Sequence, residues 1–203
     1  MPTPTVAPAV SSTVGFKNMV LAPLLTDTEQ TTTYGDLQRV AGAIEASITP
    51  ENSDPDIQFY DDVEGDVLYP DPELSFKTKL ADLPLIIQEM IFANKIDDNG
   101  VLIRTANDKP GYFAVGFMSE KANGKYRYVW LYKVRAKPLT ENYQTKEGAT
   151  ITRQTGEIEW TAIKRTSDGR YQAVADEGES GFTAAKAATF LESVYQPQFT
   201  ESP

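Results

Sequence analysis

The sequence predicts a mainly antiparallel β fold with one or two short helices, and three observations lead to that prediction. Apolar and polar residues alternate along several short runs, as expected for strands that are buried on one face. Asn-Gly or Asp-Gly dipeptides stand at 99–100, 123–124 and 168–169, and such dipeptides favour tight turns between antiparallel strands. Two segments, near residues 83–92 and 183–196, instead have the spacing of an amphipathic helix.

The length and composition suit one folded domain with extensions at both ends. The chain has 203 residues, of which 40% are hydrophobic, enough to form a core. We expect a Pro- and Thr-rich arm over 1–12, the domain over 13–176, and a helix with a tail over 177–203. No apolar run is long enough to span a bilayer, and the first residues lack the basic and apolar regions of a secretory signal. We therefore expect no export and no membrane partner.

Several classes of chemistry have no residues to support them. The chain contains no cysteine and no histidine, which removes disulfides, thiolate nucleophiles and the commonest general base and metal ligand. Glu157 and Glu159 lie two residues apart on one predicted strand, about 6–7 Å, which is compatible with a glycosidase pair. Neighbours on one strand seldom flank a sugar in that way, and no phosphate-binding loop or zinc-protease motif is present. We expect no enzymatic activity, no metal and no cofactor.

The first half of the domain contains three predicted strands. Apolar residues from Val14 to Leu25 form the first run. The run from Val40 to Thr49 predicts a second strand, with Ile44, Ala46 and Ile48 on one face and Glu45, Ser47 and Thr49 on the other. The run from Leu74 to Leu80 alternates without a break, with Ser75, Lys77 and Lys79 on its polar face. Each strand should be half-buried.

Both predicted helices have recognisable ends. Residues 83–92 should form the first helix, since Leu83, Ile86, Ile87, Met90 and Ile91 recur at helical spacing. Asp82 suits its N-cap, and Pro84 falls in the first turn, where a missing N–H costs nothing. For the C-terminal helix, Thr183 is the expected cap and Pro197 the expected stop.

Two hairpins are predicted in the second half. Tyr112–Lys121 and Tyr126–Lys137 should pair across Asn123-Gly124, with both turn residues at the positive φ of a primed turn. Glu157–Arg165 should pair with Arg170–Ala175 across Asp168-Gly169.

The strand after Gly124 carries apolar groups on both faces. Tyr126, Tyr128, Trp130 and Tyr132 alternate on one face, while Val129 and Leu131 share the other face with basic residues. An aromatic row of this kind can stack on bases or sugars, but it more often packs in a core or an interface. We interpret it as packing and expect the strand to be covered on both sides.

Charge is separated along the chain. The segment Glu51–Glu73 carries nine acidic residues and no base, whereas Lys121–Lys137 carries six bases and no acid. The acidic segment lacks the ligand spacing of a calcium loop and keeps apolar residues, so we interpret it as a docking arm or an additional strand pair.

Oppositely charged elements on one subunit suit a head-to-tail interface, although two solvated surfaces that never meet are the alternative. We hypothesise that the acidic arm of one subunit meets the basic hairpin of another. The proposed contact residues are Asp54, Asp56, Phe59, Tyr60, Asp61 and Asp62 on the arm, with Lys125, Arg127, Lys133 and Arg135 on the hairpin.

Three stretches of the chain resemble a known family. AGAIEASITP at 41–50, LADLPLIIQEM at 80–90 and the hairpin region from Lys109 to Gly148 resemble the major tail protein of long-tailed bacteriophages of Gram-positive bacteria, the subunit of the tail tube. The resemblance runs from about Val14 to Ala175 and is strongest over Leu80–Gly148. It implies an antiparallel β-sandwich or open barrel of two sheets with a flanking short helix. It also implies that six subunits form a ring and that stacked rings form a tube through which DNA leaves the capsid.

The resemblance further implies a structural role in the virion tail, with assembly in the host cytoplasm and contacts to the tape-measure protein and other tail proteins. DNA would pass through the lumen without sequence-specific binding, which agrees with a net charge of −10. The arm 1–12 and the segment 51–73 would bridge neighbouring subunits. The lumen should be polar and mostly anionic, and by strand alternation it would be lined by Glu45, Ser47 and Thr49 or by Glu157, Glu159 and Thr161.

Two alternative functions are compatible with the same pattern. One is a tail-terminator or connector protein that forms a single ring. The other is a monomeric β-sandwich that binds carbohydrate through an exposed platform of Tyr128, Trp130 and Tyr132.

Overall fold

A computed structural model describes residues 11–51, 73–141 and 156–199 in full, and the backbone of 56–60 and 63–68. The described part is mainly antiparallel β with two short helices, so the predicted fold class is confirmed. Among the described residues, no helix has the length and apolar character needed to cross a membrane. The elements in chain order are β1 (Lys17–Asp27), β2 (Thr32–Tyr34), β3 (Gln38–Val40), β4 (Ala43–Glu51), β5 (Asp56–Tyr60), β6 (Val63–Leu68), β7 (Glu73–Leu80), α1 (Leu85–Phe92), β8 (Lys95–Ile96), β9 (Leu102–Ile103), β10 (Phe113–Glu120), β11 (Tyr126–Ala136), β12 (Gly156–Ala162), β13 (Gln172–Asp176) and α2 (Ala184–Thr189).

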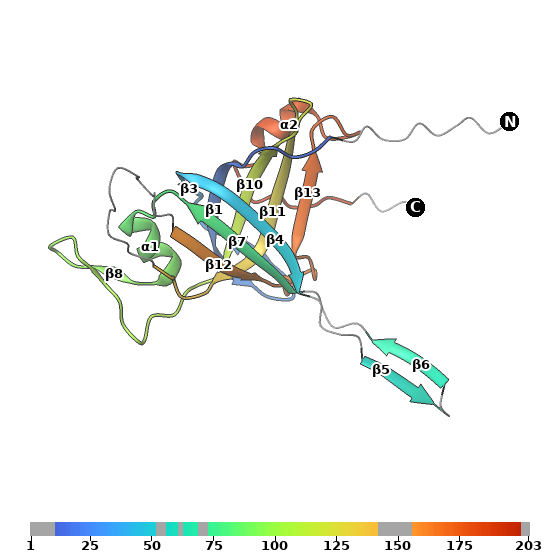
Figure 1. Cartoon of the computed structure of the whole chain (residues 1–203), viewed down its shortest axis with the longest axis horizontal. Coiled ribbons are helices and arrows are strands. Elements are labelled where there is room, and N and C mark those ends of the chain that lie inside the picture. The colour runs from blue at the N-terminus through green and yellow to red at the C-terminus, as the bar shows by residue number, and fades with distance from the viewer. Residues whose placement is uncertain (1–10, 52–55, 61–62, 69–72, 142–155, 200–203) are drawn as a thin grey trace, which may run out of the picture.

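One nine-stranded sheet folds over on itself to make the sandwich (Figure 1). Its strand order is β2-β1-β10-β11-β12-β7-β4, with β3 added to β1 and β13 added to β11. The β4-β7-β12 layer crosses in front of the β1-β10-β11 layer, and the two layers share a core (Figure 1).

Strand β11 belongs to both layers. Its first half, Arg127–Leu131, pairs with β13, whereas Val134–Ala136 pairs with β12. The sequence predicted that the strands now labelled β12 and β13 pair with each other. That prediction is wrong, because each of them pairs with β11 instead. A bulge lies between the pairs Val115↔Leu131 and Phe113↔Val134. Because a bulge changes the face on which later side chains lie, Leu131 and Val134 both contribute to the core between the layers.

The inner core lies between the layers and is closed by α1. Phe76, Leu131 and Trp160 are fully buried there, and α1 contributes Ile91 and Phe92. The alternation predicted for 74–80 is confirmed, because every second residue from Leu74 to Leu80 is buried. Local pattern was sufficient there because a half-buried strand repeats every two residues.

The aromatic face of β11 is covered by the C-terminal segment of the same chain. Tyr128, Trp130 and Tyr132 are buried in a second cluster with Ala187 of α2 and Phe190. The Trp130 indole Nε1 donates a hydrogen bond to the Phe190 carbonyl oxygen at 2.9 Å. The interpretation of this row as packing is confirmed, as is the expectation that both faces are covered.

The helix ends differ partly from prediction. Helix α1 begins at Leu85 after Pro84, which serves as N-cap without a side-chain hydrogen bond, so the prediction that Asp82 caps it is wrong. Ile86 is 67% exposed and does not lie on the buried side. In α2, Thr183 does cap the helix, since its side chain accepts from the Lys186 N–H, but the helix ends at Thr189, so the prediction that it continues to Pro197 is wrong.

Two turns also differ from prediction. The expected strand 40–49 is divided into β3 and β4 by a turn in which Gly42 has φ +76°. At the β10–β11 turn only Gly124 has positive φ, also +76°, so the predicted two-residue primed turn is wrong. The chain closes a longer turn there, in which the Gly124 N–H donates to the Lys121 carbonyl oxygen at 2.9 Å.

Candidate functional site

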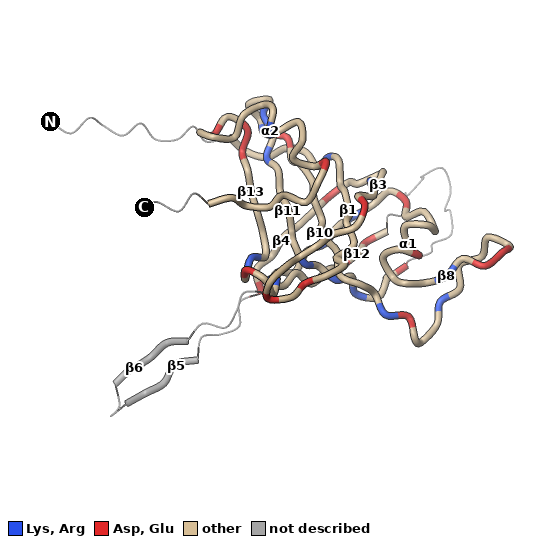
Figure 2. The backbone as a smooth tube through the Cα atoms, turned by 180° about the vertical axis from the view of Figure 1, so that it is seen from behind, with Lys and Arg blue, Asp and Glu red and all other residues tan. Residues whose placement is uncertain are grey.

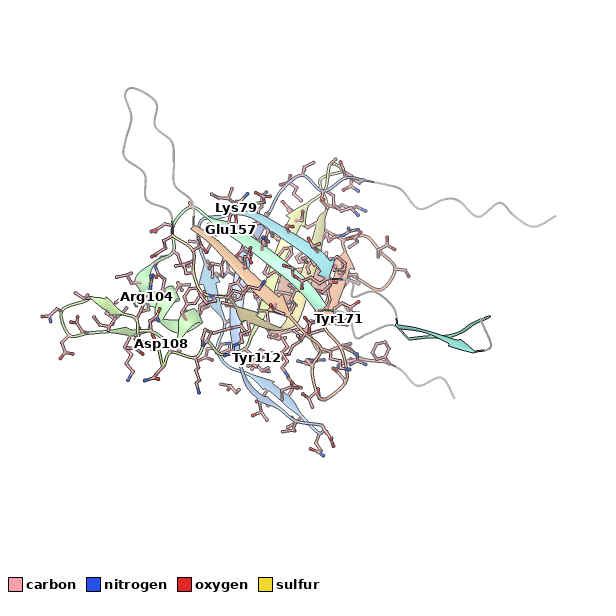
Figure 3. The ribbon with its side chains drawn as sticks, turned by 60° about the horizontal axis from the view of Figure 1, so that its bottom comes forward. Lys79, Arg104, Asp108, Tyr112, Glu157 and Tyr171 are labelled. Atoms are coloured by element: carbon pink, nitrogen blue, oxygen red, sulfur yellow. The ribbon has the colours of Figure 1, made fainter. Side chains whose placement is uncertain are left out.

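The solvent-facing side of the β4-β7-β12 layer carries polar side chains in register across three strands. We call this surface the polar face; Figure 3 labels two of its residues, Lys79 and Glu157, on neighbouring strands. Strand pairing alone brings the two predicted lumen sets together, because β7 lies between β4 and β12. The three rows are Glu45–Lys79–Glu157, Ser47–Lys77–Glu159 and Thr49–Ser75–Thr161.

Each lysine in these rows lies beside a glutamate. Lys79 Nζ is 2.9 Å from Glu45 Oε2, and Lys77 Nζ contacts Glu159 and lies 3.9 Å from Glu157 Oε1. The hydrogen bond to Glu159 raises the pKa of Lys77, and the same contact lowers the pKa of Glu159. Lys137, beyond β11, adds another amine 3.5 Å from Glu159 Oε2. The polar face therefore carries charges of both signs.

These pairs add little to stability because they are solvated. The paired side chains are between about 37% and 57% exposed, and solvent and salt screen ion pairs in such positions. Their main effect is on the surface potential, because a neighbouring glutamate carboxylate offsets the positive charge of each lysine amine.

The polar face ends at an open strand edge. Among the described strands, β4 pairs with β7 alone, so the backbone groups on its other edge have no strand partner over residues 43–51. A long open edge is a template for pairing with another chain. A bulge between Ala43 and Glu45 leaves Ile44 on this edge strand 51% exposed.

The acidic segment between β4 and β7 contains a hairpin. Strands β5 and β6 pair with each other, with Ile57 opposite Val67 and Tyr60 opposite Val63, and form a separate two-stranded sheet. Figure 1 draws this hairpin beyond the end of the sandwich at which β4 ends and β7 begins. Of the proposed arm residues, Asp56, Phe59 and Tyr60 lie in β5, while Asp54, Asp61 and Asp62 lie outside the described residues.

The basic hairpin finds acidic partners within its own subunit. Arg127 binds Asp176 through two hydrogen bonds of 2.6 and 2.7 Å, and Lys133 Nζ lies 2.6 Å from Asp27 Oδ2. Arg135 lies over the Tyr112 ring at 5.5 Å, and Lys125 is exposed. Figure 2 likewise shows acidic and basic positions next to one another at several places on the body. Two of the four proposed interface bases are thus engaged inside the subunit.

Asp27 is the more buried of these acidic partners. Burial alone would raise its pKa, but hydrogen bonds from Lys133 and from the Thr166 N–H and hydroxyl outweigh burial and lower it to about 2. The contact joins β1, β11 and the loop after β12.

Arg165 is another buried charge that the sequence did not single out. Its guanidinium is held by Asp168 and Gln196 and lies 4.1 Å from the centroid of the Tyr132 ring. Burial raises the pKa of Tyr132 to about 12, so the ring stays neutral beside this cation. Gln196 follows α2, so Arg165 fastens the C-terminal segment to the sandwich.

The described residues contain no cluster of acidic side chains suited to a metal ion. The fold and the polar face instead describe a β-sandwich whose notable surfaces are a charged sheet face, an open edge and a detached hairpin. No protein-family model matches the chain, and no curated protein sequence matches it.

Proposed function

We propose that this protein is a structural subunit that assembles with copies of itself, and that it forms the tail tube of a long-tailed bacteriophage. Six subunits would make a ring, and stacked rings would make the conduit for DNA. The tube would be built in the host cytoplasm around a tape-measure protein and would become part of the virion tail. The observation that carries the proposal is the polar face, which joins both predicted lumen sets in three registered rows beside an open edge.

The polar face suits a channel wall because it is polar and because its lysines are paired with glutamates. DNA-binding surfaces attract phosphates with lysine and arginine, and the resulting affinity depends on the number of phosphates neutralised. Here Lys77, Lys79 and Lys137 each lie within 4 Å of a glutamate carboxylate. DNA would therefore find few places to bind as it passes.

The open edge and the hairpin suit self-association. Ring closure by strand pairing would use the edge of β4, which would otherwise be an aggregation hazard. A hairpin detached from its own sandwich is suited to reach a neighbouring copy. The carbohydrate-binding alternative lacks this kind of support, since Tyr128, Trp130 and Tyr132 are buried and offer no exposed platform.

Negative-stain electron microscopy of the purified protein at raised concentration tests the proposal. Long hollow tubes are the expected result. Isolated rings would favour a tail-terminator or connector protein. Monomers that do not assemble would contradict both the tail-tube proposal and this ring-forming alternative.

A charge on the open edge sharpens the test. Ile44→Lys adds a lysine to β4, which should prevent strand addition while leaving the monomer folded. Gln30→Lys adds the same charge in the exposed turn between β1 and β2 and should leave assembly unchanged. Equal assembly of the two variants would show that β4 is not the pairing edge.

A further inference from the structure

Asn123 and Gly124 form the exposed tip of the β10–β11 turn, and a backbone nitrogen that follows an asparagine can attack the asparagine side chain. Glycine in the second position has no Cβ to obstruct that attack. No atom lies within 4 Å of the place where a Cβ on Gly124 would be. The sequence contains one other Asn-Gly pair, Asn99-Gly100, which is also exposed, in the β8–β9 turn. The two turns can therefore be compared directly.

The side-chain carbonyl of Asn123 accepts a hydrogen bond that favours such an attack. The Lys125 N–H donates to Asn123 Oδ1 at 3.1 Å. Negative charge builds on this oxygen when a nucleophile adds to Cγ, and a donor already held in place stabilises that charge. The turn therefore polarises the amide at the atom where bond formation begins.

In the β8–β9 turn the corresponding donor is directed elsewhere. The Val101 N–H, two residues after Asn99, donates to Asp97 Oδ1 at 2.8 Å, and Asn99 Nδ2 donates to Asp97 Oδ2 at 3.3 Å. The hydrogen bond from Val101 lowers the pKa of Asp97, so this carboxyl is charged at neutral pH. A carboxylate beside the Asn99 amide opposes the negative charge that an attack on Cγ would create.

The attacking nitrogen is held alike in both turns. The Gly124 N–H donates to the Lys121 carbonyl oxygen at 2.9 Å, and the Gly100 N–H donates to the Asp97 carbonyl oxygen at 3.0 Å. Each glycine also has a similar positive φ, +76° and +79°. The two sites thus differ at the amide that is attacked, not at the nucleophile.

We propose that Asn123 is a site of spontaneous deamidation, and that its conversion loosens the N-terminal segment from the sandwich. The Gly124 nitrogen gives up its proton and bonds to Asn123 Cγ, while the bond from Cγ to Nδ2 breaks. Nδ2 leaves as ammonia, which takes up a proton from solvent in place of the one that Gly124 lost. The product is a cyclic imide, and water is the only co-reactant in the step that follows.

Water opens the imide at one of its two carbonyl carbons. Attack at Cγ breaks the new bond to the Gly124 nitrogen and leaves an aspartate in an unchanged backbone. Attack at the backbone carbonyl carbon of Asn123 breaks the original peptide bond and leaves an isoaspartate, whose backbone runs through Cβ and Cγ. Isoaspartate therefore lengthens the backbone of the turn by a methylene group.

The same turn holds the N-terminal segment. The Asn123 N–H donates to Ser11 Oγ at 3.1 Å, and the Ala122 N–H donates to the Ser12 carbonyl oxygen at 2.8 Å. Val14 is 65% exposed, so its side chain contributes little burial to this attachment. A longer backbone at position 123 moves these two donors away from their acceptors, which should loosen residues 11–14.

Peptide mass spectrometry of the full chain after incubation at mildly alkaline pH measures the first part of the proposal. In the folded protein Asn123 should deamidate at least about threefold faster than Asn99, as expected for one added hydrogen bond. In urea the two rates should become similar, because each asparagine is followed by glycine. Equal rates in the folded protein, or the same ratio in urea, would overturn the assignment.

Hydrogen exchange measures the second part. In the chromatographically separated isoaspartate fraction, the Val14 and Ala122 amides should exchange at least about threefold faster than in unmodified protein. Asn123→Asp adds the same charge without lengthening the backbone, so it should exchange like unmodified protein. Unchanged exchange in the isoaspartate fraction, or equal acceleration in Asn123→Asp, would contradict release of the segment by isoaspartate.

A variant that cannot form the imide completes the test. Asn123→Ser lacks the side-chain amide, while its hydroxyl can still accept a turn hydrogen bond. After the same incubation, exchange at Val14 and Ala122 should stay as slow as before. If the Asn123→Ser variant loosens as much as wild type, a change at another residue is responsible and the proposal is wrong.

Discussion

Arg127 and Asp176 form a two-point ion pair within one subunit. Arg127 Nε donates to Asp176 Oδ1 at 2.6 Å, and Nη2 donates to Oδ2 at 2.7 Å. Lys121 Nζ also reaches Oδ2, at 2.7 Å. The acid that pairs with this end of the basic hairpin therefore comes from the end of β13, so Arg127 already has an anionic partner within its own subunit.

Replacing Asp176 should destabilise the fold. Asp176→Asn removes the charge from the hydrogen bonds with Arg127 and Lys121, and Lys121 has only 10% of its side chain exposed. We expect the free energy of unfolding to fall by about 1–3 kcal/mol, as for other charge-assisted hydrogen bonds. Urea denaturation measures the change. Glu179→Gln, in the exposed turn that follows, should stay within about 0.5 kcal/mol of wild type; equal losses in the two variants would contradict the assignment.

Asp27 should make stability depend on pH in the acidic range. Its folded pKa is about 2 against a usual value of 3.8, so the unfolded chain binds the proton more tightly. The stabilisation is complete above about pH 4 and is lost as pH falls towards 2, and a shift of this size corresponds to about 2 kcal/mol.

The matching experiment compares Asp27→Asn with wild type in urea at several pH values. The variant should be less stable by about 2 kcal/mol or more at pH 7, and the difference should shrink towards pH 2, where the wild-type carboxyl becomes neutral as well. A difference that stays constant across this range would show that packing, rather than charge, is responsible.

Gly116 should tolerate no side chain. Gly116 faces Trp130 across the β10–β11 pair, and a Cβ there would lie 2.7 Å from the indole ring. We expect Gly116→Ala to cost about 1–3 kcal/mol, because Trp130 is fully buried and cannot move aside. Gly156→Ala is the control, since no atom lies within 4 Å of the position that its methyl group would occupy. Thermal unfolding followed by tryptophan fluorescence distinguishes the two, and equal melting temperatures would contradict the packing argument.

Loss of Glu159 should make the polar face bind DNA. Glu159→Gln leaves Lys77 and Lys137 without their nearest counter-charge, while the cost in stability should be small because these ion pairs are solvated. We expect binding of a short DNA duplex, followed by fluorescence anisotropy, to increase at low salt and to disappear as salt is added. Glu29→Gln removes the same charge from the exposed β1–β2 turn, so an equal increase there would point to net charge rather than to this face.

The buried and exposed sides of a strand or helix could be predicted from the sequence where apolar residues recur at a regular spacing. The burial of Leu74, Phe76 and Leu80 follows from alternation alone, and the polar side of β4 was predicted correctly for Glu45, Ser47 and Thr49. The helix near 85–92 was also expected, although its first turn and the exposure of Ile86 were not.

Long-range pairing was beyond the reach of the same reasoning. Lys133 and Asp27 are separated by 106 residues, and Arg127 and Asp176 by 49, and no local pattern links such positions. No residue pattern in the sequence marks the bulge in β11. The side of the strand on which each residue lies could therefore be predicted from alternation only as far as Tyr132.

The sequence by itself determined the fold class, the alternating strands and the residue types of the polar face, because period and turn chemistry are properties of neighbouring residues. Only the tertiary structure decided that Glu45 and Glu157 flank Lys79 on one surface, that β11 serves two layers, and that Arg127 and Lys133 pair with acids of their own subunit. These outcomes depend on which strands pair, and strand pairing is settled by the packing of the whole chain rather than by any one segment.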